Sequence, residues 1–242
     1  MKKIISLLLV LTLMLGLAAC GGSNNETTPG GNQPAETQGQ PGNAELTQPQ
    51  SKEPVTSGEI TEAILRSWPE TPASEFSYEY SLDFDGIKVM AYNGSEDIVV
   101  IPAQIDGKAV VEVADRCFAN NSTVRAVRFP DTITTTDSVF ANNVYLEIVI
   151  AEGLHVIDYA TFLNCESLHT VLLGDHVTTI GESAFANCCS LKELRLTAPL
   201  VDPDGDDLYL AFLGCPELTI YGEGGSLLEE ITIEMGIPFV AE

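Results

Sequence analysis

Residues 177–188, VTTIGESAFANC, contain the pattern that decides the fold, because related stretches recur along the chain. Five units carry a Phe at the same place, and successive Phe residues are 22, 22, 23 and 27 positions apart. They are Phe118, Phe140, Phe162, Phe185 and Phe212. An aliphatic residue follows six positions after each Phe, at Val124, Leu146, Leu168, Leu191 and Leu218. A period of about 20 to 29 residues with such spacing predicts a solenoid, in which each coil buries its apolar side against its neighbours.

These units resemble the BspA-type leucine-rich repeat of bacterial surface proteins, whose pattern reads roughly I-P-x-x-V-T-x-I-G-x-x-A-F-x-x-C-x-x-L-x-x-V. Residues 177–188 fit that pattern throughout. The flanks agree, at Tyr92-Asn93-Gly94-Ser95, at Ile98–Pro102 and at 226–240, so the resemblance covers about residues 70–242. It implies an α/β fold: a leucine-rich-repeat solenoid with a parallel β-sheet, an N-terminal β-hairpin cap and a C-terminal helical cap. We expect the repeats at residues 101–222.

Three units depart from the pattern. Thr136 stands where a buried aliphatic residue is expected, and the next unit is one residue short between Leu146 and Ile148. The fifth unit replaces its upstream half with residues 200–209. These departures predict that the middle and the C-terminal end are the least regular coils.

Local signals predict a cap at each end of the solenoid. Thr56 and Glu59 form a capping box before apolar residues at helical spacing, which end at Pro69. Alternating residues on either side of Asp85-Gly86 then predict a hairpin, so residues 56–100 form the N-terminal cap. A second capping box at Ser226 and Glu229, with Gly236 as C-cap, predicts a helix over residues 226–235 within a closing segment at 223–242.

The N-terminus is typical of a secreted protein. Lys2 and Lys3 precede an apolar run of signal-peptide length, which we assign to residues 1–19. This run ends at Leu17-Ala18-Ala19-Cys20, which resembles the lipobox of bacterial lipoproteins and implies lipidation of Cys20. Residues 20–55 are polar and rich in Gly, Pro, Gln and Thr, a composition that predicts a disordered tether. We therefore expect a secreted protein, lipid-anchored on the extracytoplasmic face of the cell membrane.

The charge balance disfavours nucleic-acid partners. The chain carries 35 acidic against 11 basic residues, a formal net charge of −24, which becomes −26 once Lys2 and Lys3 leave with the signal peptide. Such a surface repels phosphate backbones and anionic headgroups. The sequence thus predicts attachment to the membrane through lipid alone.

No set of residues amounts to a catalytic site, so we expect a non-enzymatic protein without cofactor or metal. The three His residues lack zinc-site spacing, and the acidic loop 202–207 reads as a surface turn rather than a calcium loop, because its Gly is at the fourth position. Cys165, Cys188 and Cys215 share one slot of successive units. Disulfides are conceivable there in a secreted protein, but we favour buried free thiols, and the same for Cys117.

Basic residues gather at outward positions of the predicted strands, on one face of a very acidic protein. These are Arg125, Arg128, His169, Lys192 and Arg195. The sheet face of a repeat solenoid is its usual binding surface, so this set is a candidate ligand face for an anionic glycan or an acidic protein patch. The competing interpretation is a solvated face balanced by Glu147 and Glu193. The sequence therefore predicts a cell-surface protein that binds a protein or glycan, with an envelope-assembly component lacking an external ligand as the alternative.

Overall fold

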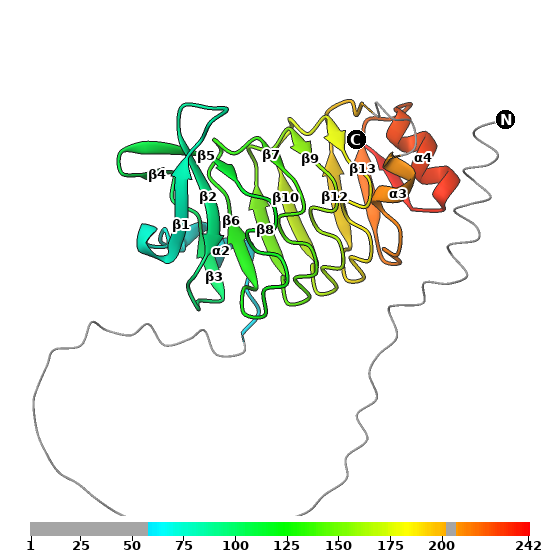
Figure 1. The fold of residues 1–242 in the computed structure, drawn as a ribbon. Helices are drawn as coiled ribbons and strands as arrows, with labels where there is room; N and C mark the ends of the chain where they lie inside the picture. Colours follow the sequence, from blue (N-terminus) through cyan, green and yellow to red (C-terminus); the bar gives the residue numbers. More distant parts are fainter. Residues whose placement is uncertain (1–57, 202–206) are drawn as a thin grey trace, which may run out of the picture.

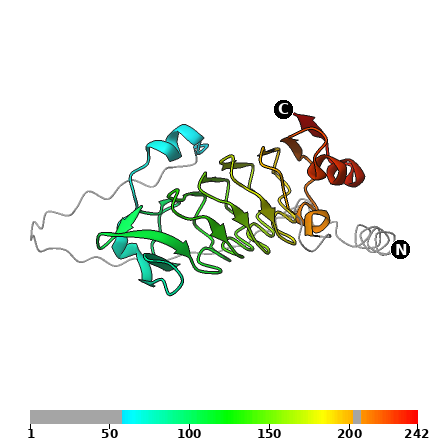
Figure 2. The same cartoon turned by 90° about the horizontal axis from the view of Figure 1, so that it is seen from above.

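The computed structural model of the protein describes residues 58–201 and 207–242 (Figure 1). The predicted signal peptide, Cys20, the tether and residues 202–206 of the acidic loop lie outside these residues. Within them the chain forms a series of stacked coils, and different elements close the two ends of the stack (Figures 1 and 2).

One parallel sheet of seven strands runs the length of the solenoid (Figure 1). In spatial order the strands are β3 (Ile98–Val100), β6 (Ala126–Arg128), β8 (Ile148–Ala151), β10 (Thr170–Leu173), β12 (Glu193–Leu196), β13 (Thr219–Gly222) and β14 (Phe239–Ala241). Each Phe unit supplies one strand, from β6 to β13, while β3 precedes the first Phe and β14 follows the last helix. The predicted solenoid with a parallel sheet is confirmed.

The short strands upstream of three Phe residues form a separate parallel sheet. They are β7 (Thr135–Thr136), β9 (Val156–Ile157) and β11 (Thr179–Ile180). Thr136, which stands in an aliphatic slot, is buried here, and its hydroxyl lies 3.3 Å from that of Thr161 in the next coil. Because the two hydroxyls satisfy each other, the polar residue is accommodated without an orphaned group.

The repeated Phe residues form a continuous column through the core. Each is at most 2% exposed, and the ring centroids of successive Phe residues are 5.1 to 5.8 Å apart in stacked orientation. Amides next to the column donate to the following coil, as Phe140 N does to Thr161 O at 2.9 Å. The coils are therefore held together both by aromatic packing and by a backbone ladder.

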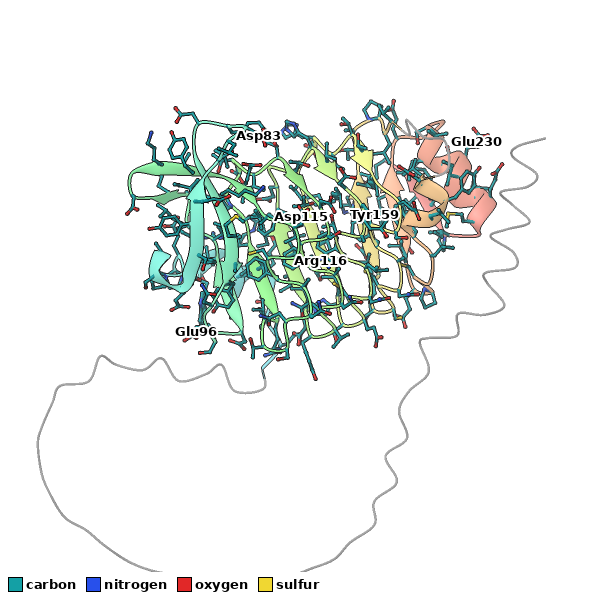
Figure 3. The ribbon with its side chains drawn as sticks, in the orientation of Figure 1. Asp83, Glu96, Asp115, Arg116, Tyr159 and Glu230 are labelled. Carbon is teal, nitrogen blue, oxygen red and sulfur yellow. The ribbon has the colours of Figure 1, made fainter. Side chains whose placement is uncertain are left out.

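Each turn around a Phe requires left-handed backbone. The residue two positions after Phe has a φ of 54° to 61° at Asn120, Asn142, Asn164 and Asn187, and Gly214 takes the last place. Asn is among the few residues that tolerate this conformation, and its side chains also form a ladder: Asn164 Nδ2 donates to Asn142 Oδ1 at 2.7 Å. Two positions before Phe, Arg116 is also left-handed at a φ of 61°, on a turn in the middle of the view in Figure 3. Asn two positions after Phe therefore suits both the left-handed backbone and the side-chain ladder.

The expected deletion between Leu146 and Ile148 is wrong. Val149 and Ala151 point into the core, and Val149 pairs in register with Val171 of the next coil. The unit therefore keeps the regular spacing, and Ile148 faces outward. The strand is apolar on both sides, so the sequence concealed which residues face the core.

Strand pairing is irregular between β10 and β12, and not between β8 and β10, where the sequence predicted it. Strands β8 and β10 pair over four residues without a shift, although they belong to the units predicted to be irregular. Strands β10 and β12 pair through only Thr170 and Glu193. The middle coils are therefore regular up to β10.

The N-terminal end carries a sheet of four strands in the order β1-β2-β5-β4. These are β1 (Phe76–Tyr80), β2 (Ile87–Tyr92), β4 (Gln104–Ile105) and β5 (Lys108–Val113), with a 3-10 turn at Ala73–Glu75 before them. The expected hairpin is present, since β1 pairs antiparallel with β2. Tyr92 continues the aromatic column, with its ring centroid 5.8 Å from that of Phe118. The hairpin therefore closes the first coil.

The N-terminal helix α2 (Glu62–Ser67) is shorter than the sequence indicated. Thr61 rather than Thr56 is its N-cap, and the Thr61 hydroxyl accepts a hydrogen bond from Ile64 N at 3.4 Å. Ile60, the first apolar residue of the expected helix, is buried although it precedes the cap and lies outside the helix. The predicted helix was therefore too long, because Ile60 fits the helical spacing of apolar residues but is not part of the helix.

The C-terminal end is closed by helices and by the last strand. Helix α3 (Asp207–Ala211) precedes the fifth Phe, and helix α4 (Leu227–Met235) follows β13. The predicted cap holds: Ser226 accepts from Glu229 N, and Gly236 is left-handed at a φ of 73°. The chain then returns to add β14 to the sheet beside β13, which the sequence did not predict. Figure 3 labels Glu230 on α4 at this end.

Candidate ligand-binding face

Outward side chains of the seven-stranded sheet form two rows across the strands. One row is Ile98, Ala126, Ile148, Thr170, Glu193 and Thr219, and the other is Val100, Arg128, Ile150, Leu172, Arg195 and Tyr221. The rows are mostly apolar on β3, β6 and β8 and mostly polar on β10, β12 and β13. We call these two parts the covered half and the open half of the face.

Helix α2 lies across the covered half (Figure 2), and Ile60, which precedes the N-cap of the helix, packs on the same strands. Ile60 and Leu65 are at most 1% exposed there, and they form one apolar cluster with Ile98, Ile148 and Ile150. Ile64 and Trp68 pack against the edge of this cluster. The covered half is thus occupied by the chain itself.

Arg125, the first residue of the predicted ligand face, holds the segment that leads into α2. Its guanidinium makes a bidentate pair with Glu147, at 2.7 and 3.0 Å, and donates to the carbonyl of Gly58 at 3.2 Å. Hydrogen bonding to Glu147 is the main reason that the pKa of Arg125 is raised. Arg125 is therefore engaged within the molecule.

Arg128 is engaged in the same way at the other end of α2. It donates to the carbonyl of Arg66 at 2.9 Å, where the last turn of the helix leaves carbonyl groups without intrahelical partners. Arg66 itself makes a bidentate pair with Glu152, at 2.6 and 3.0 Å. This contact lowers the pKa of Glu152, chiefly through the hydrogen bond. Two of the five predicted ligand residues therefore fix α2.

The other three predicted residues line a groove of about 830 Å³ on the open half. His169, Lys192 and Arg195 lie in it together with Thr170 and Leu172 of the sheet. Four carboxylates also line the groove, at Glu59, Glu147, Glu193 and Glu217. Its walls are therefore mixed in charge rather than basic.

The three basic side chains in the groove differ in how many contacts they make within the protein. Lys192 is exposed and makes no ion pair with the described residues. Arg195 pairs with Glu242, lies 3.9 Å from Glu193 and covers the ring of Tyr221 at 4.2 Å. His169 Nδ1 lies 2.9 Å from the hydroxyl of Thr170. Lys192 is thus the most available cation of the set.

The stacked cysteines are buried free thiols, as expected. Each donates to the carbonyl of a Phe in the preceding coil, as Cys188 Sγ does to Phe162 O at 3.2 Å. The same contact joins Cys165 to Phe140 and Cys215 to Phe185. Burial raises the pKa of Cys165 and Cys188 well above the usual thiol value, and that of Cys117 to about 12. These thiols are therefore packing groups that stay protonated.

Neither a metal-binding cluster nor a membrane-spanning helix occurs among the residues that the structure describes. No group of three or more His, Cys, Asp or Glu side chains there could hold a metal ion. No helix in those residues has the length and apolar character needed to cross a bilayer.

The sequence predicted a helix before Pro69 but not that this helix covers half of the predicted face. A signal was present in the uninterrupted apolar runs Ile98-Val99-Val100-Ile101 and Ile148-Val149-Ile150-Ala151. Strands with one solvated face alternate, whereas strands buried on both faces read as continuous apolar runs. These two runs therefore mark the strands that α2 covers.

Comparisons with known proteins agree with this architecture. The model of the BspA type leucine rich repeat region matches residues 96–203, in 6 copies. A leucine-rich repeat protein from T. pallidum is 30% identical, with a TM-score of 0.55 over 63% of this chain and 71% of that one. A leucine-rich cell surface protein from Faecalibacterium prausnitzii is 22% identical, with a TM-score of 0.52 over 66% of this chain and 46% of that one. No curated protein shows significant similarity. The chain belongs to the BspA-type leucine-rich repeat family.

Proposed function

We propose that this protein is held at the cell surface by lipid on Cys20 and binds another macromolecule, a protein or a glycan, in the groove on the open half of its sheet. Repeats of the BspA type suggest a protein-binding or adhesion role at the surface. The observation that carries the proposal is the groove itself. It is the part of the outward face that α2 leaves uncovered, and polar side chains from successive coils line it.

The chemistry of the groove favours a ligand rich in hydrogen-bonding groups. Lys192 and Arg195 stand beside Glu193 and Glu217, so both donors and acceptors are offered over a short distance. A uniformly anionic ligand would meet repulsion from the four carboxylates. A sugar with many hydroxyls or a protein surface of mixed charge fits better. These side chains come from successive coils along the sheet, as in other solenoid binding surfaces.

The test begins with the full-length protein on arrays of glycans and of surface proteins. For any ligand found, Lys192→Ser combined with Arg195→Ser should reduce affinity about tenfold or more, because hydrogen bonds to charged groups are lost. Lys108→Ser is the matched control, since Lys108 lies on the N-terminal cap away from the groove. Arg125 and Arg128 are left unchanged, because they hold α2. Undiminished binding by the double variant would contradict the groove assignment.

The surface location is tested on intact cells. Protease added from outside should cleave the module, and Cys20→Ser should move the protein from the membrane fraction to the medium, because the lipid chains are its proposed attachment. A module that is protected from external protease would instead favour a role in envelope assembly without an external ligand.

A further inference from the structure

Helix α2 covers an apolar surface that remains defined without it. The covered strip consists of Ile98, Val100, Ala126, Ile148 and Ile150. All five side chains point outward from three paired strands, on the face opposite the Phe column. Their positions are fixed by the backbone ladder of the solenoid, so the strip does not depend on α2 for its shape.

The hold of α2 on the strip is weak compared with the hold of one coil on the next. α2 has six residues, a length at which an isolated helix is not stable in water. In the part of the chain that the structure describes, no backbone-to-backbone hydrogen bond joins α2 to the sheet. The Arg66–Glu152 pair is 41% exposed on both sides, and exposed pairs contribute little. We therefore expect α2 to open without unfolding of the coils.

The contacts of α2 specify what kind of segment the strip accepts. Apolar side chains at Ile60, Ile64, Leu65 and Trp68 lie toward the strip. Arg66 pairs with Glu152, and Arg128 binds the carbonyl at the helix end. Ile64 and Leu65 lie in the helix, whereas Ile60 precedes its N-cap and Trp68 is its C-cap, so the strip receives a short helix with one apolar anchor on either side of it, a short form of helix-in-groove binding.

We propose that the covered strip is a second binding surface, which receives an amphipathic helix from another protein, and that α2 is its built-in competitor. The partner helix carries apolar residues at the spacing of α2 and at least one basic residue opposite Glu152. The net charge of −24 favours a partner helix that is cationic on its remaining face. This surface is separate from the groove, so it does not depend on the proposed groove ligand.

The competition determines how tightly a partner binds. Partner affinity is reduced by the fraction of molecules in which α2 is closed. A segment of the same chain has an effective concentration in the millimolar range, so a partner must bind more tightly than α2 or meet an opened protein. Changes that loosen α2 should therefore strengthen partner binding, which is the opposite of what damage to a binding site does.

The experiment uses the full chain and, as probe, a fluorescein-labelled peptide of residues 58–69. Ile64→Ser combined with Arg66→Ala loosens α2 in the protein, whereas the peptide keeps both side chains. Ala63→Ser is the matched control, because Ala63 is exposed on the same helix. We expect the loosened protein to bind the peptide at least about tenfold more tightly than the control does, since its own competitor is weakened.

Two measurements keep the proposal open to refutation. In the unaltered protein, amides of residues 62–67 should exchange with solvent at least about tenfold faster than those of β8, as expected for local opening. In the loosened protein, Glu152→Gln should weaken peptide binding about two- to fivefold, the effect of an exposed ion pair. The proposal would be overturned if the amides of α2 exchanged no faster than those of β8. It would also be overturned if the loosened variant folded but did not bind the peptide. Dimerisation of the loosened variant in place of peptide binding would also overturn it, in favour of exchange between copies.

Discussion

The two faces of the seven-stranded sheet follow different rules. Beneath the inner face the repeat places similar side chains in every coil, and the Phe column and the aliphatic residues six positions after each Phe are all buried. On the outward face the residue type changes along the sheet: one row passes from Val100 and Ile150 to Arg195 and Tyr221. Both faces are built on the same strands and the same register.

This difference shows which part of the sequence is constrained by stacking. An inward side chain must fit against its own counterpart one coil away, so its size is fixed by the repeat. An outward side chain meets solvent, α2 or a ligand, and it varies with that neighbour. Uniformity therefore marks the scaffold, and variation marks where function is expected.

The largest effect should come from a break in the inner column. Phe162→Ala removes a ring stacked between Phe140 and Phe185, and we expect it to lower the free energy of unfolding by about 3–5 kcal/mol. Chemical denaturation measures the change. A loss below about 1 kcal/mol would show that the coils relax into the space and that the column is not the scaffold.

The next test compares the two halves of the outward face. Ile150 and Leu172 are paired neighbours in one row, but Ile150 is 1% exposed beneath α2 whereas Leu172 is only half-buried. We expect Ile150→Ala to cost about 2–4 kcal/mol, and Leu172→Ala less than about 1.5 kcal/mol. Denaturation of both variants measures the contrast. Equal losses would mean that α2 adds no burial of consequence.

The slot three positions after each Phe holds Cys in the last three coils but Asn in the first two, at Asn121 and Asn143. Asn143 has the same position in its coil as Cys165 has in the next coil, and its side chain is fully buried. Neither polar atom of that side chain has a hydrogen-bond partner among the described residues. Asn143→Cys should raise the free energy of unfolding by about 1–3 kcal/mol, because the orphaned amide is replaced by a thiol placed to donate to the Phe118 carbonyl. Asn121→Cys is the contrast and should lower stability, because Asn121 Oδ1 accepts hydrogen bonds from Thr123 N and Val124 N. An unchanged or lower stability of the Asn143→Cys variant would indicate that the amide is satisfied in solution.

The smallest effect concerns pH and the hold of α2. Arg66 lowers the pKa of Glu152, so the stabilisation from this pair is complete above the ordinary Glu value of 4.5 and is lost as pH falls through the lowered value. Because both groups are largely exposed, we expect less than about 1 kcal/mol. The fluorescence of Trp68, the only tryptophan, reports the detachment.

Glu152→Gln is the control for that titration. It removes the charge at all pH values, so α2 should be looser at neutral pH and its fluorescence should change less on acidification. If the variant and the unaltered protein gave superimposable acid transitions, Glu152 would have no part in holding α2.

The core of the fold followed from the sequence, while the candidate site followed only in part. The spacing of the Phe residues predicted the stacked column, and Ser226 with Gly236 predicted α4. Of the five basic residues, Arg128 and Arg195 lie in the outward rows of the sheet, whereas Arg125, His169 and Lys192 lie directly before strands β6, β10 and β12, and their partners were not foreseen. Arg125 and Arg128 serve α2, and only His169, Lys192 and Arg195 line the groove. Local pattern gives the side of a strand on which a residue lies, and it does not give the segment that will cover it.

The sequence by itself determined the coil. Because the units repeat at a nearly constant period, each unit packs against a similar unit, and this fixes which residues face the core. The tertiary structure alone decided which outward residues are free. Ile60 and Leu65 reach Ile148 and Ile150 across a long separation in the chain, and an apolar run such as Ile148-Val149-Ile150 reads the same whichever residue faces the core. Burial on that face is a property of two distant segments together, so neither segment specifies it alone.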